Sequence, residues 1–210
     1  MAKVCPEITE PLVRIDIARG RGDELPQAIT SLWNGATVLD LGSGEGAYSF
    51  LAATAVGESG CVIGVETTPD MISQARVNLI HSRFCNVSFR LGELEYLPVA
   101  DQSVDVIISH YGINQSCGKA QMFREALRVL KPGGRLAMIE MVITQVLPED
   151  VEEDGALMLD DIEDMLRAAG FDRIRSQTRP PRNGFYHVPA ISRSVKNMTD
   201  PVLVEAVRPA

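Results

Sequence analysis

A glycine-rich stretch, VLDLGSGEGAYSF, covers residues 38–50 and carries an acidic residue just ahead of its glycines. Gly42, Gly44 and Gly46 occupy alternate positions, and such a turn after a strand lets a ligand lie against bare backbone where a helix begins. Turns of this kind usually hold phosphate. A carboxylate repels phosphate, so Asp40 raises the question of which ligand this turn binds.

A dinucleotide is the first ligand to weigh. Dinucleotide sites have the spacing GxGxxG, whereas the spacing here is GxGxG. Asp40 and Glu45 would both lie beside the diphosphate, and each close pair of like charges costs on the order of 1–4 kcal/mol in a partly dry cleft. The acidic residues therefore argue against NAD and FAD.

S-adenosylmethionine is the second ligand to weigh, and it carries no phosphate. Its sulfonium and its α-ammonium group are cations, and an acid at the end of a strand holds the ammonium group directly or through water. Glu66 ends the next predicted strand, where a carboxylate accepts hydrogen bonds from both ribose hydroxyls. Asp40 and Glu66 together favour S-adenosylmethionine over a dinucleotide.

Predicted strands and helices alternate along most of the chain, which indicates a parallel sheet with helices on both faces. Apolar runs predict strands at 36–42, 61–66, 86–93, 101–111, 135–141, 171–178 and 200–207. Helical patterns lie at 46–56, 68–83, 119–130 and 159–170, and KPGG is predicted to turn into the fifth strand. The last two strands have little between them for a helical crossover, so we expect an antiparallel pair at one edge.

The length of 210 residues fits one domain of ordinary size. We expect an N-terminal helical segment over residues 1–35 and a single catalytic-type domain over 36–210. The substrate pocket is then either open or completed by a partner chain, and a monomer and a homodimer both stay possible.

Four motifs in order resemble the class I S-adenosylmethionine-dependent methyltransferases. They are VLDLGSGEG, VIGVETTPDMISQAR, VDVIISHYGIN and ALRVLKPGGRLAMIE. The resemblance covers residues 36–143 with good specificity and extends more loosely to residue 208. Its nearest branch is the methyltransferase type 11 and arsenite-methyltransferase-like group. The resemblance implies an α/β, Rossmann-like three-layer sandwich whose mostly parallel seven-stranded sheet has an antiparallel last strand.

The resemblance also implies which residues hold the cofactor, S-adenosyl-L-methionine, and its product S-adenosyl-L-homocysteine. Thr67 and Met71 match residues that flank the ribose and adenine. Glu93 matches an Asp that receives the adenine amino group, and Leu94 offers its backbone N–H to the ring. The full predicted set is Asp40, Gly42, Ser43, Gly44, Gly46, Glu66, Thr67, Met71, Glu93, Leu94 and Ser109.

Methyl transfer from a sulfonium is an in-line displacement, in which the protein mainly aligns donor and acceptor and excludes water. His110 and Tyr111 follow the fourth strand, and we predict that they line the transfer site as the catalytic residues. Further candidates in loops at this rim are Asn114, Glu140, Tyr186 and His187.

The absence of cysteines at two positions argues against arsenite as the acceptor, because the arsenite branch binds arsenic with thiolates. Tyr111 occupies the position where that branch has a Cys, and the stretch VEEDGAL has none. Cys61 and Cys85 begin strands at the opposite rim, which leaves Cys117 as the one thiol on the active rim. The spacing of the cysteines predicts reduced thiols and no metal site.

The formal net charge of −8 disfavours nucleic acid as a partner. The first residues have no apolar signal-peptide core and no stretch has 18 uninterrupted apolar residues, so we expect a cytoplasmic protein without a membrane span. A small-molecule acceptor is the favoured substrate. Two alternatives stay open: a non-catalytic protein that binds S-adenosylmethionine as a scaffold, and methylation of a protein or RNA.

Overall fold

The computed structural model describes residues 29, 31–113, 116–143, 157–178 and 199–210. Strands and helices alternate along them as predicted. The strands are β1 (Thr37–Leu41), β2 (Cys61–Glu66), β3 (Val87–Leu91), β4 (Val104–His110), β5 (Leu130–Ile143), β6 (Leu157–Met158), β7 (Asp172–Thr178) and β8 (Thr199–Val207). The helices are α2 (Ala47–Val56), α3 (Pro69–Ile80), α4 (Lys119–Val129) and α5 (Leu159–Ala169).

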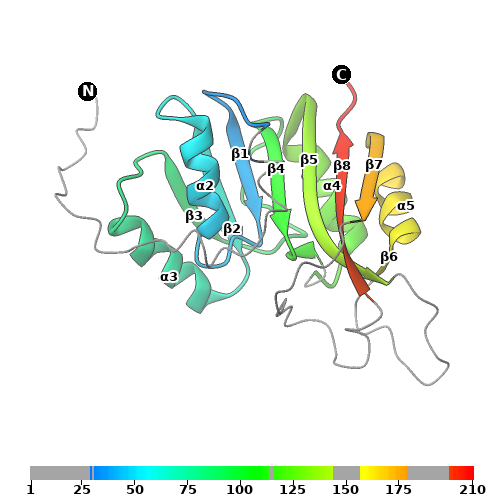
Figure 1. Cartoon of the computed structure of the whole chain (residues 1–210), viewed down its shortest axis with the longest axis horizontal. Coiled ribbons are helices and arrows are strands. Elements are labelled where there is room, and N and C mark those ends of the chain that lie inside the picture. Colours follow the sequence, from blue (N-terminus) through cyan, green and yellow to red (C-terminus); the bar gives the residue numbers. More distant parts are fainter. Residues whose placement is uncertain (1–28, 30, 114–115, 144–156, 179–198) are drawn as a thin grey trace.

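One sheet runs through the molecule with the strand order β3-β2-β1-β4-β5-β8-β7 (Figure 1). Strands β1 to β5 pair in parallel, and β8 pairs antiparallel with both β5 and β7. The two-residue strand β6 pairs with β5 beside this path. The predicted seven-stranded sheet with an antiparallel last strand is confirmed. The strand order reverses between β1 and β4, which is where ligands bind in such sheets.

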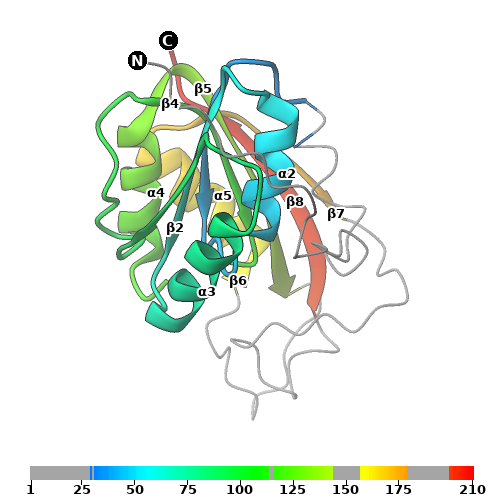
Figure 2. The same ribbon diagram turned by 90° about the vertical axis from the view of Figure 1, so that its left-hand side faces the viewer.

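Helices cover both faces of the sheet, which gives three layers (Figures 1 and 2). Side chains of β1 alternate between the faces. Val38 packs in the core formed with α2 and α3, whereas Leu39 and Leu41 pack in the core formed with α4 and α5. Asp40 follows the same alternation as Val38 and therefore lies on the α2 side of the sheet.

Most element boundaries agree with the predicted ones within about three residues, and two differences bear on the loops. The helix that begins at Pro69 ends at Ile80 rather than at residue 83. The predicted KPGG turn falls inside strand β5, which begins at Leu130. The register shifts where this stretch passes β4, since Val104 pairs with Leu130 and Val106 with Arg135. The turn thus remains as an irregularity within a longer strand.

The predicted N-terminal helical segment, residues 1–35, lies almost entirely outside the described residues and stays a prediction. In the part of the chain that the structure describes, none of the helices has both the length and the apolar character needed to span a bilayer.

Candidate active site

The turn after β1 is held against the end of β2. The backbone N–H groups of Gly42 and Ser43 both donate to the carbonyl of Val65, at 2.9 and 3.1 Å. Gly42 has a φ of 70°, and a Cβ there would lie 2.9 Å from the Cα of Gly112 in the loop after β4. Glycine is therefore required at position 42 both for the backbone conformation and for the close approach of the two loops.

Gly44 and Gly46 complete the turn. A Cβ at Gly44 would meet no atom within 4 Å, so this part of the backbone faces open space. Gly46 is the N-cap of α2. The hydroxyl Oγ of Ser43 is buried and has no hydrogen-bond partner within the described part of the chain. The predicted cofactor turn thus offers exposed backbone at Gly44, together with one buried hydroxyl that lacks a hydrogen-bond partner among the described residues.

Asp40 is only 2% exposed at the end of β1. Its Oδ2 accepts a hydrogen bond of 2.6 Å from the hydroxyl of Ser49 in α2. Burial raises the pKa of Asp40 to about 7; the Ser49 hydrogen bond works in the opposite direction, and the nearby charge of Glu66 raises it further. A cation that binds beside this carboxyl group would stabilise its ionised form and lower its pKa.

Glu66 at the end of β2 is a hub of backbone hydrogen bonds and is 5% exposed. Its Oε2 accepts from the N–H of Gly44 at 2.9 Å, and its Oε1 accepts from the N–H groups of Thr67 and Thr68 at 3.0 and 2.9 Å. The carboxylate thereby ties the glycine turn to the start of α3. Its second function, beyond the predicted ribose contact, is to hold the turn in place.

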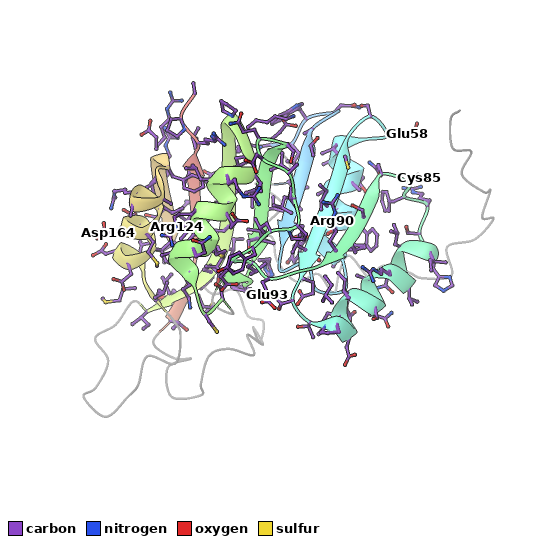
Figure 3. The ribbon with its side chains drawn as sticks, turned by 180° about the vertical axis from the view of Figure 1, so that it is seen from behind. Glu58, Cys85, Arg90, Glu93, Arg124 and Asp164 are labelled. Atoms are coloured by element: carbon purple, nitrogen blue, oxygen red, sulfur yellow. The ribbon has the colours of Figure 1, made fainter. Side chains whose placement is uncertain are left out.

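A cavity of about 450 Å³ opens past the ends of β2 and β3, and Thr67 in its wall directly follows Glu66. It is lined by Thr67, Glu93, Leu94, Glu95, Tyr96, Ser116, Cys117 and Gly118. Three predicted cofactor residues, Thr67, Glu93 and Leu94, are therefore brought together. Figure 3 shows Glu93 at the rim of the molecule opposite Glu58, which lies near the start of β2. Met71, in the first turn of α3, is 43% exposed.

Glu95 closes the far wall of the cavity, and the sequence did not point to it. Its carboxylate accepts hydrogen bonds from the hydroxyl of Ser116 and from the N–H of Gly118, the latter at 2.9 Å. Partial burial raises the pKa of Glu95, but these hydrogen bonds outweigh that effect and leave it below its usual range. Glu95 thus fixes the segment before α4 against the loop after β3. The separation of these residues along the chain hid this contact.

Ser109, another predicted cofactor residue, is fully buried. Its hydroxyl donates to the carbonyl of Leu41 at 3.0 Å and so joins the end of β4 to the end of β1. This hydrogen bond gives Ser109 a bracing function, and a direct contact with the cofactor stays a prediction.

His110 and Tyr111 lie together with Tyr48 of α2, which the sequence did not single out. The Nε2 of His110 is 3.1 Å from the hydroxyl of Tyr48, and the two rings are 4.4 Å apart. The ring of Tyr111 is 4.2 Å from the imidazole. Burial lowers the pKa of His110 to about 4, so the imidazole is neutral at physiological pH. The position of Tyr48 in the first turn of α2 is visible in the sequence, but its contact with His110 depends on how α2 packs against the sheet.

Tyr111 has a φ of 57°, which is uncommon for a residue other than glycine. Its N–H donates to the carbonyl of Ile139 at 2.9 Å, and Glu140 accepts the N–H of Ile113 at 2.8 Å. These two contacts with β5 hold the loop after β4 in its strained shape. Glu140 is fully buried, and its observed contact is structural. Asn114, Tyr186 and His187 lie outside the described residues.

Cysteines differ from the prediction in one respect. Cys61 and Cys117 are free thiols, as expected, but Cys85 is disulfide-bonded, so the prediction of reduced thiols was wrong for this residue. Figure 3 shows Cys85 away from the rim that carries Glu93, in agreement with its predicted place. Among the described residues, no group of three or more His, Cys, Asp or Glu side chains is arranged to hold a metal ion.

A glycine turn with two buried acids, at the point where the strand order reverses, is the architecture that the four motifs implied. The family model of a methyltransferase domain matches residues 32–179. The chain belongs to the class I S-adenosylmethionine-dependent methyltransferases. This confirms the predicted family and agrees with the predicted fold.

Relatives within the family methylate different small molecules, according to their names. An arsenite methyltransferase of Halobacterium salinarum is 41% identical over 204 residues, which are 93% of this chain and 52% of that protein. A demethylmenaquinone methyltransferase of Lactococcus lactis is 36% identical over 106 residues, covering 50% of this chain and 42% of the relative. This methyltransferase chain thus spans about half the length of the curated relatives it matches.

A solved structure shows the same fold. It is CrArsM, an arsenic(III) S-adenosylmethionine methyltransferase from Chlamydomonas reinhardtii. The TM-score is 0.68 at 29% sequence identity, and the match covers 84% of this chain and 64% of that one.

Proposed function

We propose that this chain binds S-adenosyl-L-methionine and transfers its methyl group to a small-molecule acceptor, releasing S-adenosyl-L-homocysteine. The observation that carries the proposal is the burial of Asp40 and Glu66 at the ends of neighbouring strands. The turn that follows Asp40 has backbone at Gly44 that faces open space. A buried acid whose pKa is raised to about 7 favours a cationic ligand, and it disfavours phosphate for the same reason.

The residues present fit this cofactor. Asp40 would hold the ammonium group, and Glu66 would accept the ribose hydroxyls while keeping its backbone contacts. The cavity beside Thr67, Glu93 and Leu94 would take the adenine. Met71 and the turn formed by Gly42, Ser43, Gly44 and Gly46 would complete the set. When bound, the cofactor supplies an electrophilic methyl group.

The transfer end would lie at the end of β4. His110 and Tyr111 would line it, and Ser109 would brace the strand that carries them. Because a displacement at a sulfonium needs alignment more than acid or base chemistry, a rigid wall of rings suits this function.

Titration calorimetry with S-adenosylmethionine and S-adenosylhomocysteine tests the cofactor site. We expect binding of both ligands to the wild-type protein. Asp101→Asn, which removes the charge of a side chain that is 73% exposed, serves as the control and should bind equally well. If no heat is seen at high ligand concentration, the proposal is wrong.

Transfer itself needs a second measurement. The protein is incubated with cofactor carrying a labelled methyl group and with metabolite extracts, and label in new products is counted. Labelled small products would support the enzyme. Cofactor binding without transfer across many extracts would favour the non-catalytic scaffold, and label in protein or RNA would favour those acceptors.

Arsenite is a second candidate acceptor, because the similar proteins include arsenite methyltransferases and an arsenic(III) methyltransferase. Against it, Tyr111 stands where a thiolate was expected, and Cys117 is the one free thiol found on the cavity wall in the described part of the chain. Incubation with arsenite and glutathione should yield no methylated arsenic above the buffer control, and its appearance would select arsenite instead.

The partner and location predictions belong to the same proposal. A net charge of −8 supports a small-molecule partner over nucleic acid, and a monomer and a homodimer are both compatible with it. The free thiols of Cys61 and Cys117 support a cytoplasmic location, whereas the disulfide of Cys85 does not.

A further inference from the structure

Tyr48 makes two contacts with His110, and they restrain the imidazole in complementary ways. The hydroxyl lies 3.1 Å from Nε2, within hydrogen-bonding distance. The phenol ring lies 4.4 Å from the imidazole ring at an angle of 39°. Because one contact fixes a ring nitrogen and the other fixes the ring plane, the side chain of His110 has little freedom left.

The imidazole also contacts Tyr111, whose ring centroid lies 4.2 Å away at an interplanar angle of 61°. Tyr111 is held there by its left-handed backbone and by its bond to the carbonyl of Ile139. An imidazole that is buried against two aromatic rings is poorly solvated, and burial disfavours its charged form. The surroundings of His110 therefore select its neutral form.

A neutral imidazole carries one proton, and the partner of each nitrogen decides where it lies. A tyrosine hydroxyl is both donor and acceptor, so either neutral tautomer of His110 is compatible with the 3.1 Å contact to Nε2. A donor role for Tyr48 leaves Nε2 as the acceptor and places the proton on Nδ1. His110 then presents a neutral N–H donor, and a neutral donor does not repel a sulfonium as an imidazolium would.

We propose that Tyr48 is a positioning residue that holds His110 as the neutral Nδ1–H tautomer, so that the transfer site selects an acceptor that reacts as an oxygen or sulfur anion. This inference rests on the proposed function of the same site. A neutral amine is disfavoured as acceptor, because a donated hydrogen bond would occupy the lone pair that has to attack. An oxygen or sulfur anion keeps further lone pairs for the displacement.

The step balances without a proton transfer. A lone pair of the acceptor anion forms the new bond to the methyl carbon, and the electron pair of the broken C–S bond stays on the donor sulfur. The anion becomes a neutral ether or thioether, and the sulfonium becomes a neutral thioether. His110 donates one hydrogen bond throughout and neither gains nor loses a proton.

The tautomer is measurable on the protein alone. Long-range ¹H–¹⁵N spectra of histidine-labelled protein at pH 7 distinguish a protonated from an unprotonated ring nitrogen. We expect His110 in the Nδ1–H form in the wild type, and a mixture of tautomers in Tyr48→Phe, which keeps the ring and removes the hydroxyl. His81→Gln, at the exposed end of α3, and His187→Gln identify the signals of the other two histidines and should leave the His110 signals in place. An Nε2–H form, or unchanged signals in Tyr48→Phe, would overturn the proposal.

The acceptor class is tested with three small probes and labelled S-adenosylmethionine at pH 8: thiophenol, 4-nitrophenol and aniline. We expect transfer to thiophenol and 4-nitrophenol at least tenfold faster than to aniline. Tyr48→Phe should lower kcat about tenfold for the anionic probes while leaving the Kd for the cofactor within about twofold. Equal or faster transfer to aniline, or none to the anionic probes, would contradict the inference. Calorimetry separates this failure from that of the proposed function, since cofactor binding would persist in the former and vanish in the latter.

Discussion

The ends of β1 and β4 lie side by side in the sheet, yet they treat their titratable side chains in opposite ways. Leu41 of β1 pairs with Ser109 of β4. Asp40 directly precedes Leu41, and His110 directly follows Ser109. Burial raises the pKa of Asp40 to about 7 and lowers that of His110 to about 4. The physical cause is the same, because a dry environment disfavours the charged form of an acid and of a base alike.

The difference lies in what surrounds each neutral form. His110 is enclosed by Tyr48 and Tyr111, which suit an uncharged ring. Asp40 has one hydrogen-bond donor in Ser49 and a second acid nearby in Glu66. The neutral form of His110 at the β4 end therefore needs no ligand to stabilise it. The ionised form of Asp40 at the β1 end, in contrast, would be stabilised by a bound cation.

Asp40→Asn should have the largest effect on the difference between the two strand ends. Asparagine keeps the shape and an acceptor for Ser49, but it removes the charge. We expect S-adenosylmethionine binding to weaken by a factor of about 100 or more, the scale of removing one partner from a buried ion pair. Calorimetry checks this, with Asp101→Asn as the control. Near-wild-type affinity would show that the cation binds elsewhere.

The same variant should be more stable than the wild type in the absence of cofactor. The folded pKa of Asp40 lies above its unfolded value of 3.8, so the wild type loses stability as pH rises from about 4 to 7. A difference of about three pKa units corresponds to about 4 kcal/mol. Thermal unfolding should show Asp40→Asn ahead at pH 8 and level with the wild type at pH 4. A constant gap across this range would contradict the prediction.

Glu66→Ala tests the hub at the end of β2. We expect the binding free energy of the cofactor to weaken by about 1–3 kcal/mol, because hydrogen bonds to a charged group are lost. Stability should also fall, since the N–H groups of Gly44, Thr67 and Thr68 lose their acceptor. Calorimetry and urea unfolding measure the two effects. A loss of binding without any loss of stability would mean that the hub is not structural.

The number of protons released when the cofactor binds tests the raised pKa of Asp40 directly. Asp40 is about half protonated at pH 7, and a bound cation favours its ionised form. We expect binding of S-adenosylmethionine at pH 7 to release about half a proton, measured by calorimetry in buffers of different ionisation heat. Affinity should fall by about fivefold from pH 7 to pH 6, because the ionised fraction of Asp40 falls from about one half to about one tenth. No proton release in the wild type would contradict the raised pKa.

His110→Gln should have the smallest effect, and only on the acid side. The folded pKa of His110 lies below its unfolded value of 6.5, so the wild type loses stability as pH falls through 6.5 toward 4. The variant lacks this loss, and its stability relative to the wild type should rise by about 2 kcal/mol or less between pH 7 and pH 5. Thermal unfolding checks this, with His81→Gln as the control. An unchanged gap would show that His110 titrates normally.

Sequence patterns predicted the two ends to different extents. Asp40 and Glu66 were accessible to sequence reasoning because each is the last polar residue of an apolar strand, and parallel strands place such residues at one rim. Tyr48 was not, because its importance depends on how α2 packs above β4. Ser109 was placed correctly at the end of β4, but its bond to the Leu41 carbonyl follows from strand pairing that the sequence does not specify.

The same limit applies to the loops. The turn at Gly42 follows from its motif, whereas the contact between Glu95 and the Ser116–Gly118 region joins segments that no motif connects. Contacts between side chains far apart in sequence depend on the final packing, and local propensity carries no information about them.

The touching backbones of Gly42 and Gly112 restrict how this enzyme family member can be altered. A Cβ at Gly112 would lie 2.7 Å from the carbonyl oxygen of Leu41, and one at Gly42 would lie 2.9 Å from the Cα of Gly112. The turn at Gly42 and the loop that carries Tyr111 are therefore packed backbone against backbone, with no room for a side chain between them. Engineering a new acceptor preference should begin with ring substitutions at Tyr48 or Tyr111, since remodelling the backbone between these glycines would disturb donor and acceptor together.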